Sequence, residues 1–484
     1  MTVLSNIQSL SSYLPELMIV LLILAVFLYE SIEKYRSLVF SISCGGLIFV
    51  SILLYFSNPS SNILFDGMLI NDSLSIYFKW ILLLSTLSVV IVSNKDNSIL
   101  DFVKGEYFGM LLIILLGMFA MVSVNNLLMV YLAIEMVSIP SYIIAGISKN
   151  SKESNEASLK YVIYGSFASG IMLFGLSLLY GIAGSTDINI LATKIASFDS
   201  SFVIYLSMIF VIAGFGYKIS MVPFHYWTPD VYQGAPIPVT AFLSVAPKAA
   251  GFAILIRFFY AVFVNNGVPI IEWTTFIAIF SALTMTVGNV LALKQDNIKR
   301  LLAYSSISHV GFMLIAFSII SIDSIASILF YLVFYMFMNL SAFYMAIYMS
   351  SNYGANNVDD WNGIGKKVPV LSFFMVLSLA SLAGLPPTSG FIGKVYVLRN
   401  LFSDGQFLWL GLVAIINTVI SLYYYFKIVK AMYFMENDTM DIKPCYPCLY
   451  WIIIIFSAQN IMFYLYWEPL WKLVESIIKN MGIV

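Results

Sequence analysis

The feature that most limits how this chain folds is a succession of long apolar runs separated by short polar segments. About 20 apolar residues is the length that an α-helix needs to cross the hydrocarbon core of a bilayer. We identify fourteen such runs, over residues 13–32, 37–57, 71–93, 105–122, 125–148, 158–182, 203–222, 236–264, 270–293, 299–321, 324–351, 368–384 continuing to 402, 405–434 and 447–467. They predict an all-α polytopic membrane protein with about 14 transmembrane helices.

The composition supports a lipid environment. Of the 484 residues, 61% are hydrophobic and 10% are charged, whereas a soluble chain carries about 25% charged residues. The net charge of −1 gives no global field that would attract nucleic acid. The first apolar run lacks a preceding basic segment and lies between "YLPE" and "YESIEKYR", so we expect a retained first span and not a cleaved signal peptide.

Basic residues orient these spans, because cytoplasmic loops are enriched in Lys and Arg. The loops after spans 2, 4, 8 and 10 contain neither residue, and the loop "DVYQGAPIP" after span 7 is short and not basic. Loops after odd-numbered spans carry most of the basic residues: Lys34, Arg36, Lys95, Lys104, Lys149, Lys152, Lys160, Lys294, Lys299, Arg300, Lys366, Lys367, Lys427, Lys430 and Lys443. Odd-numbered spans should therefore end in the cytoplasm, with both termini on the periplasmic side.

Five ionisable residues fall near the middle of the bilayer or beside a helix break: Glu135, Lys218, Lys248, His309 and Lys394. Glu135 lies ten residues into span 5, which is about 15 Å deep. A charge at this depth costs at least about 2.5 kcal/mol, so such groups face a bundle interior or a water-filled path. Static ion pairs are one interpretation. Four bases against one acid favour a proton relay, because some lysines must be neutral part of the time.

Other charged residues are ordinary in this interpretation. His225 follows Pro223, and a capping or interfacial role and a role in proton transfer are both open for it. We expect Lys79 and Arg257 to reach the membrane surface by snorkelling. Three acids occur at span ends, where charges are common: Glu30, Glu33 and Asp72.

Prolines interrupt spans 7 and 12, at Pro223 and at Pro386–Pro387. Because broken backbone at membrane depth is tolerated only inside protein or along a cavity, each break predicts a polar interior. The breaks are five spans apart, an offset that reverses helix direction. We therefore predict an inverted repeat of spans 4–8 and 9–13, with Glu135 matching His309. The expected parts are residues 1–104, an N-terminal three-helix segment; 105–264 and 265–434, the two antiporter-like repeats; and 435–484, a C-terminal span and tail.

No cofactor motif is complete. Gly393-Lys394 resembles a phosphate loop, but Thr388 and Val395 break the pattern. Dinucleotide, haem and iron–sulfur patterns are absent from the sequence, so we expect no bound cofactor and no metal. Cys445 and Cys448 form a "CYPC" pair. This pair is either a redox or zinc half-site or a chance pair at a membrane edge; without a second ligand pair, chance is favoured.

Three stretches carry a family resemblance: "KISMVPFHYWTPDVYQGAPIPVTAFLSVAPKAAGFAIL", "ALKQDNIKRLLAYSSISHVGF" and "SLAGLPPTSGFIGKVYV". They closely resemble chain N of the bacterial proton-pumping NADH:quinone oxidoreductase, respiratory complex I, whose mitochondrial counterpart is NADH dehydrogenase subunit 2. The resemblance covers the whole chain. It implies a translocase subunit of the membrane arm that moves protons across the cell inner membrane.

The resemblance also implies residue roles. Glu135 of span 5 would pair with Lys218 of span 7, Lys248 would form the middle of the path, and Lys394 would face the exit side. His309 would fill a histidine position found in some relatives. FMN, iron–sulfur clusters and quinone (ubiquinone in some relatives) would be bound by other subunits, and the partners would be subunits A, H, J, K, L and M of complex I.

Three other functions remain to be distinguished. A subunit of a multi-subunit cation/proton antiporter would share the fold and the buried lysines, but the quoted stretches favour the complex I subunit. A purely structural membrane-arm subunit is disfavoured by the excess of lysines over acids. A membrane enzyme acting on lipid would need paired carboxylates or a metal cluster, and the sequence shows neither.

Overall fold

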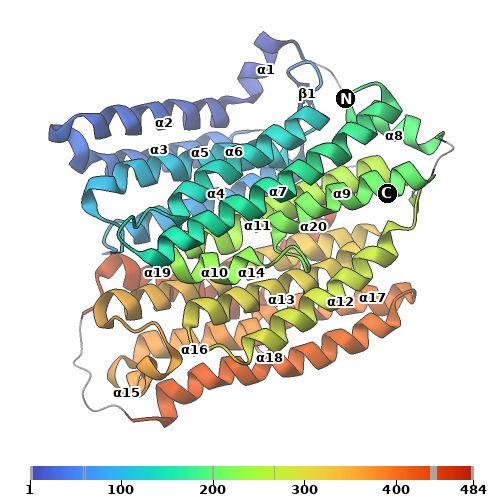
Figure 1. The fold of residues 1–484 in the computed structure, drawn as a ribbon. Helices are drawn as coiled ribbons and strands as arrows, with labels where there is room; N and C mark the ends of the chain where they lie inside the picture. Colours follow the sequence, from blue (N-terminus) through green and yellow to red (C-terminus); the bar gives the residue numbers. More distant parts are fainter. Residues whose placement is uncertain are drawn as a thin grey trace.

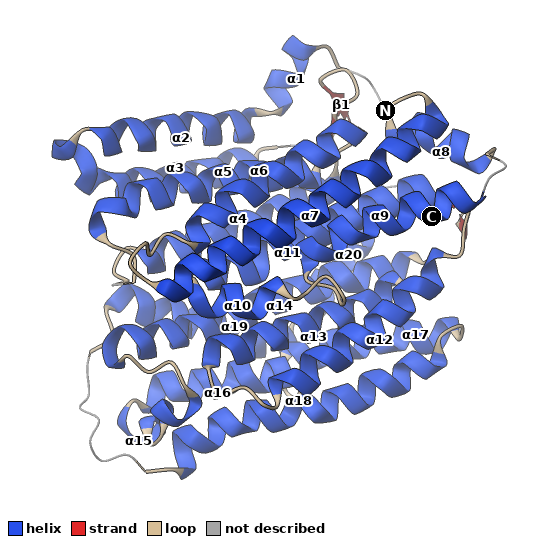
Figure 2. Ribbon diagram, in the orientation of Figure 1, coloured by secondary structure: helices blue, strands red, loops and turns tan. Residues whose placement is uncertain are grey.

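The computed structural model describes residues 4–57, 59, 62–96, 98–198, 201–265, 267–436 and 444–480. Helices dominate this part of the chain, and the few short strands lie in connections between them (Figure 2). Lys443, one of the predicted cytoplasmic basic residues, lies outside the described residues.

The N-terminal elements form one edge of the bundle, drawn in blue in Figure 1. A two-stranded antiparallel hairpin, in which Ile63 pairs with Ile70, connects the second long helix to the third. The elements are α1 (Asn6–Ser12), α2 (Leu14–Ser31), η1 (Glu33–Leu38), α3 (Val39–Tyr55), β1 (Asn62–Leu64), β2 (Leu69–Asn71) and α4 (Ser73–Ser93).

The next group runs from the start of the fourth span to the end of the eighth. It consists of η2 (Asp101–Val103), α5 (Lys104–Val122), α6 (Leu127–Ala145), α7 (Lys152–Ala183), α8 (Ile188–Ala196), α9 (Ser201–Ile219), α10 (Trp227–Gly234) and α11 (Ile237–Phe263). A short hairpin of β3 (Val264–Asn265) and β4 (Val268–Pro269) follows it.

The remaining elements complete the bundle, whose opposite edge is α18 in orange (Figure 1). They are α12 (Trp273–Ala292), α13 (Ile298–Phe317), α14 (Ile322–Tyr353), η3 (Val358–Trp361), α15 (Ile364–Lys367), α16 (Pro369–Ala383), α17 (Ser389–Asp404), α18 (Leu408–Phe434), α19 (Pro447–Leu465) and α20 (Glu468–Lys479).

Among the described residues, thirteen helices are long and apolar enough to cross a membrane, and α16 is a shorter apolar helix. Together they correspond one to one with the fourteen predicted spans, since α16 and α17 are the two halves of the broken span 12. The chain is therefore a multi-pass membrane protein. The central helices α11, α13 and α14 are almost completely buried, whereas most residues of α2, α3, α18 and α19 are at least partly exposed.

The two repeats match element by element. Helices α7 and α14 both have 32 residues, begin at a serine cap, and end at a glycine with φ of 66°. Helices α11 and α18 both have 27 residues. Left-handed backbone at Gly184 and Gly354 needs no Cβ, so the same stop signal ends the same helix twice. The predicted internal repeat is confirmed.

Each repeat contains a backbone bridge at an equivalent helix cap, and these bridges allow the residues of the two repeats to be aligned. Asn126, the cap of α6, bridges to Asp187, and Asn297, the cap of α13, bridges to Asn357. Counting nine residues from each cap reaches Glu135 in α6 and Ser306 in α13; counting twelve reaches Ser138 and His309. By this count Ser306 occupies the position of Glu135, and His309, the predicted match, lies one helical turn further along α13.

Several helices were not predicted. The amphipathic α8 and α20 are too short and too polar for a span-length search. Helix α10 forms within the segment that was interpreted as irregular, with Pro229 near its start where a missing N–H is harmless. Span 6 also begins earlier than predicted, at Lys152, because Ser151 caps the helix.

Candidate functional site

A stripe of three residues on α13 organises the buried polar groups. Ser306, His309 and Phe312 follow one another at intervals of three, so they lie on one face of the helix, about one turn apart. Helix α13 packs among α10, α12, α14 and α17, and both Ser306 and His309 are buried. The stripe therefore faces the protein interior and meets side chains from several helices.

Lys248 reaches the first residue of this stripe. It lies on α11 with no exposed surface, and its Nζ donates a hydrogen bond of 2.8 Å to Oγ of Ser306. The same Nζ lies 5.7 Å from the ring centroid of Tyr232, close enough for a cation–π contact. One hydroxyl and one ring face are poor substitutes for the three hydrogen bonds that water offers an ammonium group.

His309 connects the stripe to two tyrosines. Its Nδ1 lies 2.7 Å from the hydroxyl of Tyr331 on α14, and its Nε2 lies 3.2 Å from the hydroxyl of Tyr425 on α18. The Tyr425 hydroxyl is also 2.5 Å from Oγ of Ser305. Each of these groups both donates and accepts hydrogen bonds, so the imidazole lies in a buried chain that can pass a proton.

Lys394 meets the other end of the stripe. Its Nζ lies 5.1 Å from the ring centroid of Phe312 and donates hydrogen bonds to the carbonyl oxygens of Ala383, at 2.8 Å, and Leu382, at 3.3 Å. These carbonyls belong to the last turn of α16, whose oxygens have no partner in the helix. The negative end of a helix dipole stabilises a cation here.

Lys218 occupies the corresponding place at the first break. It lies in the last turn of α9 and is buried. Its Nζ donates to Oγ of Ser138 on α6 at 3.1 Å, but it forms no ion pair within 4.0 Å of Glu135. The expected direct pair of Glu135 and Lys218 is therefore corrected to contact through the next turn of α6. Glu135 is partly buried, and its Oε1 has no hydrogen-bond partner among the described residues.

Helix α11, which carries Lys248, packs against α9, which carries Lys218. Gly251 follows Lys248 by one turn and packs against the end of α9, where a Cβ at this position would lie 3.6 Å from Cγ of Lys218. The absence of a side chain at Gly251 lets the two lysine-bearing helices approach closely. The predicted residues Glu135, Lys218, Lys248, His309 and Lys394 are thus joined in one row across α6, α9, α11, α13 and α17.

The prolines at the breaks do not lie inside the protein. Pro223, Pro386 and Pro387 are all exposed, whereas Lys218 and Lys394 beside the breaks are buried. Proline has no N–H to satisfy, so its apolar ring can face outward. The freed polar groups turn inward: the Val222 N–H donates to Oγ1 of Thr284, and the Gly390 N–H donates to Oγ of Ser381.

His225 is buried within the first break. Its Nδ1 has no hydrogen-bond partner among the described residues, and its ring packs against Tyr226 with centroids 4.6 Å apart. Helix α10 begins after Tyr226 without a side-chain cap, so the capping interpretation was wrong. None of the described hydrogen bonds joins the His225 side chain to the row of lysines.

The two residues expected to snorkel instead form buried ion pairs. Nζ of Lys79 on α4 lies 2.6 Å from Oε1 of Glu16 on α2, and both side chains are almost fully buried. Nη2 of Arg257 lies 2.8 Å from Oδ1 of Asp72, the cap of α4. Nε of Arg257 also donates a hydrogen bond to the Val122 carbonyl. Snorkelling failed as a prediction because each residue had a partner from a distant span, which sequence spacing does not reveal.

None of the three lysines in the row has an ion pair in the described part of the chain. Their ammonium groups contact hydroxyl groups, backbone carbonyls and aromatic ring faces. Because like charges in a low-dielectric interior repel strongly, the row can hold a proton at one lysine more easily than at all three. Such an arrangement suits stepwise proton transfer.

Sequence analysis missed the hydroxyl groups that connect the ionisable residues. Two of them carried a signal in their spacing: Ser138 follows Glu135 by three residues, and Ser306 precedes His309 by three. Tyr331 and Tyr425 carried none, since tyrosine is frequent throughout this sequence. Their role depends on how α14 and α18 pack around α13.

Metal-ligating groups do not assemble in the described residues: no three of His, Cys, Asp and Glu gather at one point. Cys44, Cys445 and Cys448 are free thiols. The Cys445 Sγ donates to the Tyr446 carbonyl, which is local packing. The CYPC pair contributes nothing to the row of lysines.

Comparison with known proteins places this row in a family. Residues 124–421 match the transmembrane family described as "NADH:quinone oxidoreductase/Mrp antiporter, TM". The chain belongs to this family. The matched range contains α6 through most of α18, and therefore every member of the row from Glu135 to Lys394.

Relatives within the family match nearly full-length. NADH-quinone oxidoreductase subunit N of Anaeromyxobacter sp. is 36% identical over 97% of both chains. Subunit N of Chlorobium chlorochromatii is 40% identical over 88% of this chain and 86% of its own length. A chain of respiratory complex I from Thermus thermophilus has the same fold, with a TM-score of 0.80 and 27% identity over 95% of this chain and 99% of that one.

Proposed function

We propose that the chain is the proton-translocating membrane-arm subunit N of an NADH:quinone oxidoreductase. The observation that carries the proposal is the row of ionisable groups from Glu135 to Lys394 in the interior of a subunit N fold, in which hydroxyls contact Lys218, Lys248 and His309. As such a subunit, the chain takes part in an H⁺-translocating enzyme, and electron transfer from NADH to quinone takes place in its partners.

Proton transfer along the row begins with Glu135 and Lys218. A proton that enters near Glu135 charges Lys218, whose ammonium is held by Ser138. Charge on Lys218 makes a second charge on nearby Lys248 unfavourable. When Glu135 loses its negative charge, the Lys218 ammonium is no longer stabilised by it, and the proton can move toward Lys248 on the helix packed against the end of α9.

The second half of the row delivers the proton. Ser306 receives the hydrogen bond of Lys248 and lies one turn from His309. His309, with Tyr331 and Tyr425, forms a neutral relay that accepts on one ring nitrogen and donates from the other. Lys394 accepts the proton at the end of α16, where the helix dipole stabilises the charge. His225 is a second candidate acceptor at the first break.

The relatives are named as subunits of NADH-quinone oxidoreductase, which supports a proposal about the partners. We infer that the chain binds other membrane-arm subunits, with A, H, J, K, L and M as the expected set, and that FMN, iron–sulfur clusters and quinone belong to the partners. We also propose a bacterial cytoplasmic membrane with both termini on the periplasmic side, since the basic loops follow odd-numbered spans.

The test is to tag the chain, extract native membranes in mild detergent and assay the purified material for NADH:quinone reductase activity. We expect the activity to copurify with a large multi-subunit complex. If the chain purifies with a few small membrane partners and without NADH oxidation, but supports sodium–proton exchange in vesicles, it is a subunit of a cation/proton antiporter.

A further inference from the structure

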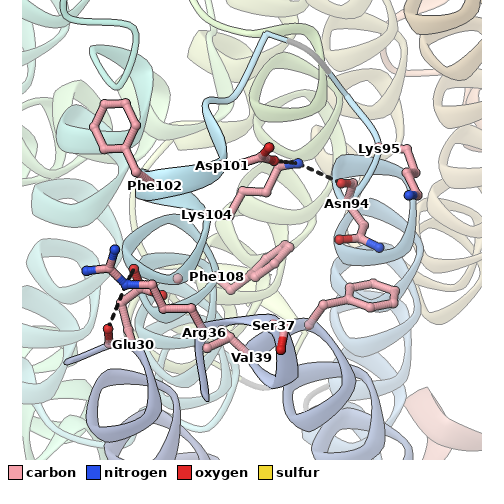
Figure 3. A pocket seen from close by; sticks show the side chains of 12 residues that line it. Glu30, Arg36, Ser37, Val39, Asn94, Lys95, Asp101, Phe102, Lys104 and Phe108 are labelled. Carbon is pink, nitrogen blue, oxygen red and sulfur yellow. Dashed lines mark hydrogen bonds and ion pairs between the residues drawn. The ribbon is translucent and has the colours of Figure 1, made fainter. Parts of the chain in front are cut away.

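A cavity of about 620 Å³ lies far from the row of lysines, where the N-terminal helices meet the core (Figure 3). It is bounded by the end of α2, η1 and the start of α3 on one side, and by the end of α4, η2 and the start of α5 on the other. Its volume lies within the range of about 300–1,000 Å³ that is typical of small-molecule sites.

Three cationic side chains from three different elements line this cavity: Arg36, Lys95 and Lys104. Two carboxylates face them. Arg36 Nε lies 3.3 Å from Glu30 Oε1, and Lys104 Nζ lies 2.5 Å from Asp101 Oδ1. Lys95 has no hydrogen bond or ion pair within the described part of the chain, so its ammonium group is available to a ligand, and three cationic side chains and two carboxylates line the cavity.

The donors of Arg36 are only partly used. Nε donates to the Glu30 carbonyl at 3.1 Å. In Figure 3 the two terminal nitrogens of its guanidinium point away from Glu30, toward open space. A free guanidinium end presents parallel N–H groups that match the geometry of a phosphate.

Close packing and hydrogen bonds restrict several of the side chains that line the cavity. Gly105 opens α5 directly against the Glu30 carboxylate, and any side chain at this position would collide with it. Lys104 is also tied to the Asn94 carbonyl at 2.7 Å, and Phe108 is buried beneath it. Arg36 and Lys104 are therefore held at defined positions around the cavity.

Apolar surface surrounds the charged groups. Phe102, which lines the cavity, is 63% exposed, and the neighbouring Leu38 and Leu100 are also exposed. Helices α2 and α3, which lead away from the cavity, expose a lipid-facing side that includes Leu24, Leu28, Ile48 and Phe49. An anionic headgroup over apolar helix surface is the environment of a phospholipid at the end of a span.

We propose that this cavity binds the phosphate-bearing headgroup of an anionic phospholipid, with Arg36 contacting the phosphate, Lys95 attracting the headgroup from the other end of the cavity, and the acyl chains lying along α2 and α3. The exposed Phe102 and the apolar flank favour a lipid over free phosphate, which would fill a small part of 620 Å³ and leave this surface in water. The bound lipid would link α2 and α3 to α4 and α5.

The test is titration of the purified complex with phosphatidylglycerol and with phosphatidylcholine, with bound lipid measured by native mass spectrometry. We expect phosphatidylglycerol to bind more tightly. The double variant R36Q/K95Q should bind it about tenfold more weakly or worse, since the charge-assisted contact of Arg36 and the longer-range attraction of Lys95 are both lost. K152Q, at an exposed lysine outside the cavity, is the matched control and should bind as the native chain does.

A second variant separates binding from misfolding. D101N removes a negative charge and frees Lys104, so it should strengthen phosphatidylglycerol binding, an effect that damage to the fold does not produce. The proposal is overturned if the two lipids bind equally, if K152Q weakens binding as much as R36Q/K95Q, or if D101N weakens it. It is also overturned if inorganic phosphate displaces the lipid at equal concentration, which would identify a free phosphate site.

Discussion

Lys218 donates its hydrogen bond to Ser138 at 3.1 Å, one helical turn beyond Glu135 on the same face of α6. The carboxylate is therefore near enough to influence the ammonium through space, but it does not hold it. A lysine fixed by a full ion pair would keep its proton. Contact through a hydroxyl leaves Lys218 able to release it, which is the behaviour that a relay needs.

Replacing Lys218 with methionine should stop proton translocation while the complex still assembles. Methionine retains the length of the side chain but carries no proton, so we expect pumping in vesicles, followed by dye quenching, to fall about tenfold or more. K152M, at an exposed lysine, serves as the control and should pump normally. Unchanged pumping in K218M would remove Lys218 from the pathway.

Ser306 should be required for its hydroxyl and not for its volume. S306A leaves the buried Lys248 ammonium without its hydrogen-bond partner, which favours the neutral amine and should slow proton transfer. S306T restores the hydroxyl and should recover most of the activity. The measurement compares the pumping rates of S306A and S306T. Equal rates would show that proton transfer does not need the hydrogen bond between Lys248 and Ser306.

Gly384 should position Lys394. Its φ is +81°, and a Cβ would lie 2.7 Å from Cδ of Lys394. G384A should therefore strain the end of α16 and displace the lysine from the Ala383 carbonyl. We expect a loss of pumping comparable to that of K394M. G405A, at another left-handed glycine with open space around it, should cost stability through the backbone alone and leave pumping intact.

The buried pair of Glu16 and Lys79 should show strong coupling in thermal unfolding. Either E16L or K79M leaves an unpaired charge in the interior, at a cost of about 3–5 kcal/mol. The double variant E16L/K79M removes both charges and should recover most of the lost stability. Unfolding of the purified chain in detergent provides the measurement, and additive effects of the two substitutions would contradict a paired role.

Asp230 should stabilise the fold at neutral pH and lose its effect in acid. Burial raises the pKa of Asp230, but hydrogen bonds from Lys160 at 2.6 Å and Arg300 at 2.5 Å outweigh it and hold the pKa below its usual range. Because the folded-state pKa is lower than the unfolded one, the stabilisation is full above the unfolded value, about 3.9, and declines as pH falls through the folded value.

The comparison for this prediction is D230N. At pH 7 it should unfold at a lower temperature than the native chain, and the difference should shrink as the pH falls below about 4. A difference that stays constant with pH would mean that Asp230 acts through packing and not through its charge. Helix α10 would then be held against α7 and α13 by its apolar face alone.

Much of the fold was readable because lipid imposes a length and a composition on every spanning helix. The boundaries of α4 and α18 agree with the predicted spans within a few residues, and the equal lengths of α7 and α14 confirm the repeat. Helix α20 was not foreseen, since a helix that lies on other helices needs only an apolar stripe, here Val474, Ile477 and Ile478.

The site was predictable in its ionisable members and not in their contacts. Glu135, Lys218, Lys248, His309 and Lys394 stood out because a charge within an apolar run is rare. Lys79 stood out equally and was misjudged, because its partner Glu16 comes from a span 63 residues earlier. Pairing across helices is decided by packing, and a single sequence gives no direct measure of packing.

Two copies of one helical unit, placed in opposite directions, make a frame with no preferred direction of its own. The direction of proton movement must therefore come from positions at which the side chains of the two copies differ. Where the first copy has Glu135 and Ser138, the second has Ser306 and His309. Exchanging these two pairs of side chains would move the carboxylate from α6 to α13 and the imidazole from α13 to α6, so these four residues help to make the two ends of the proposed proton path different.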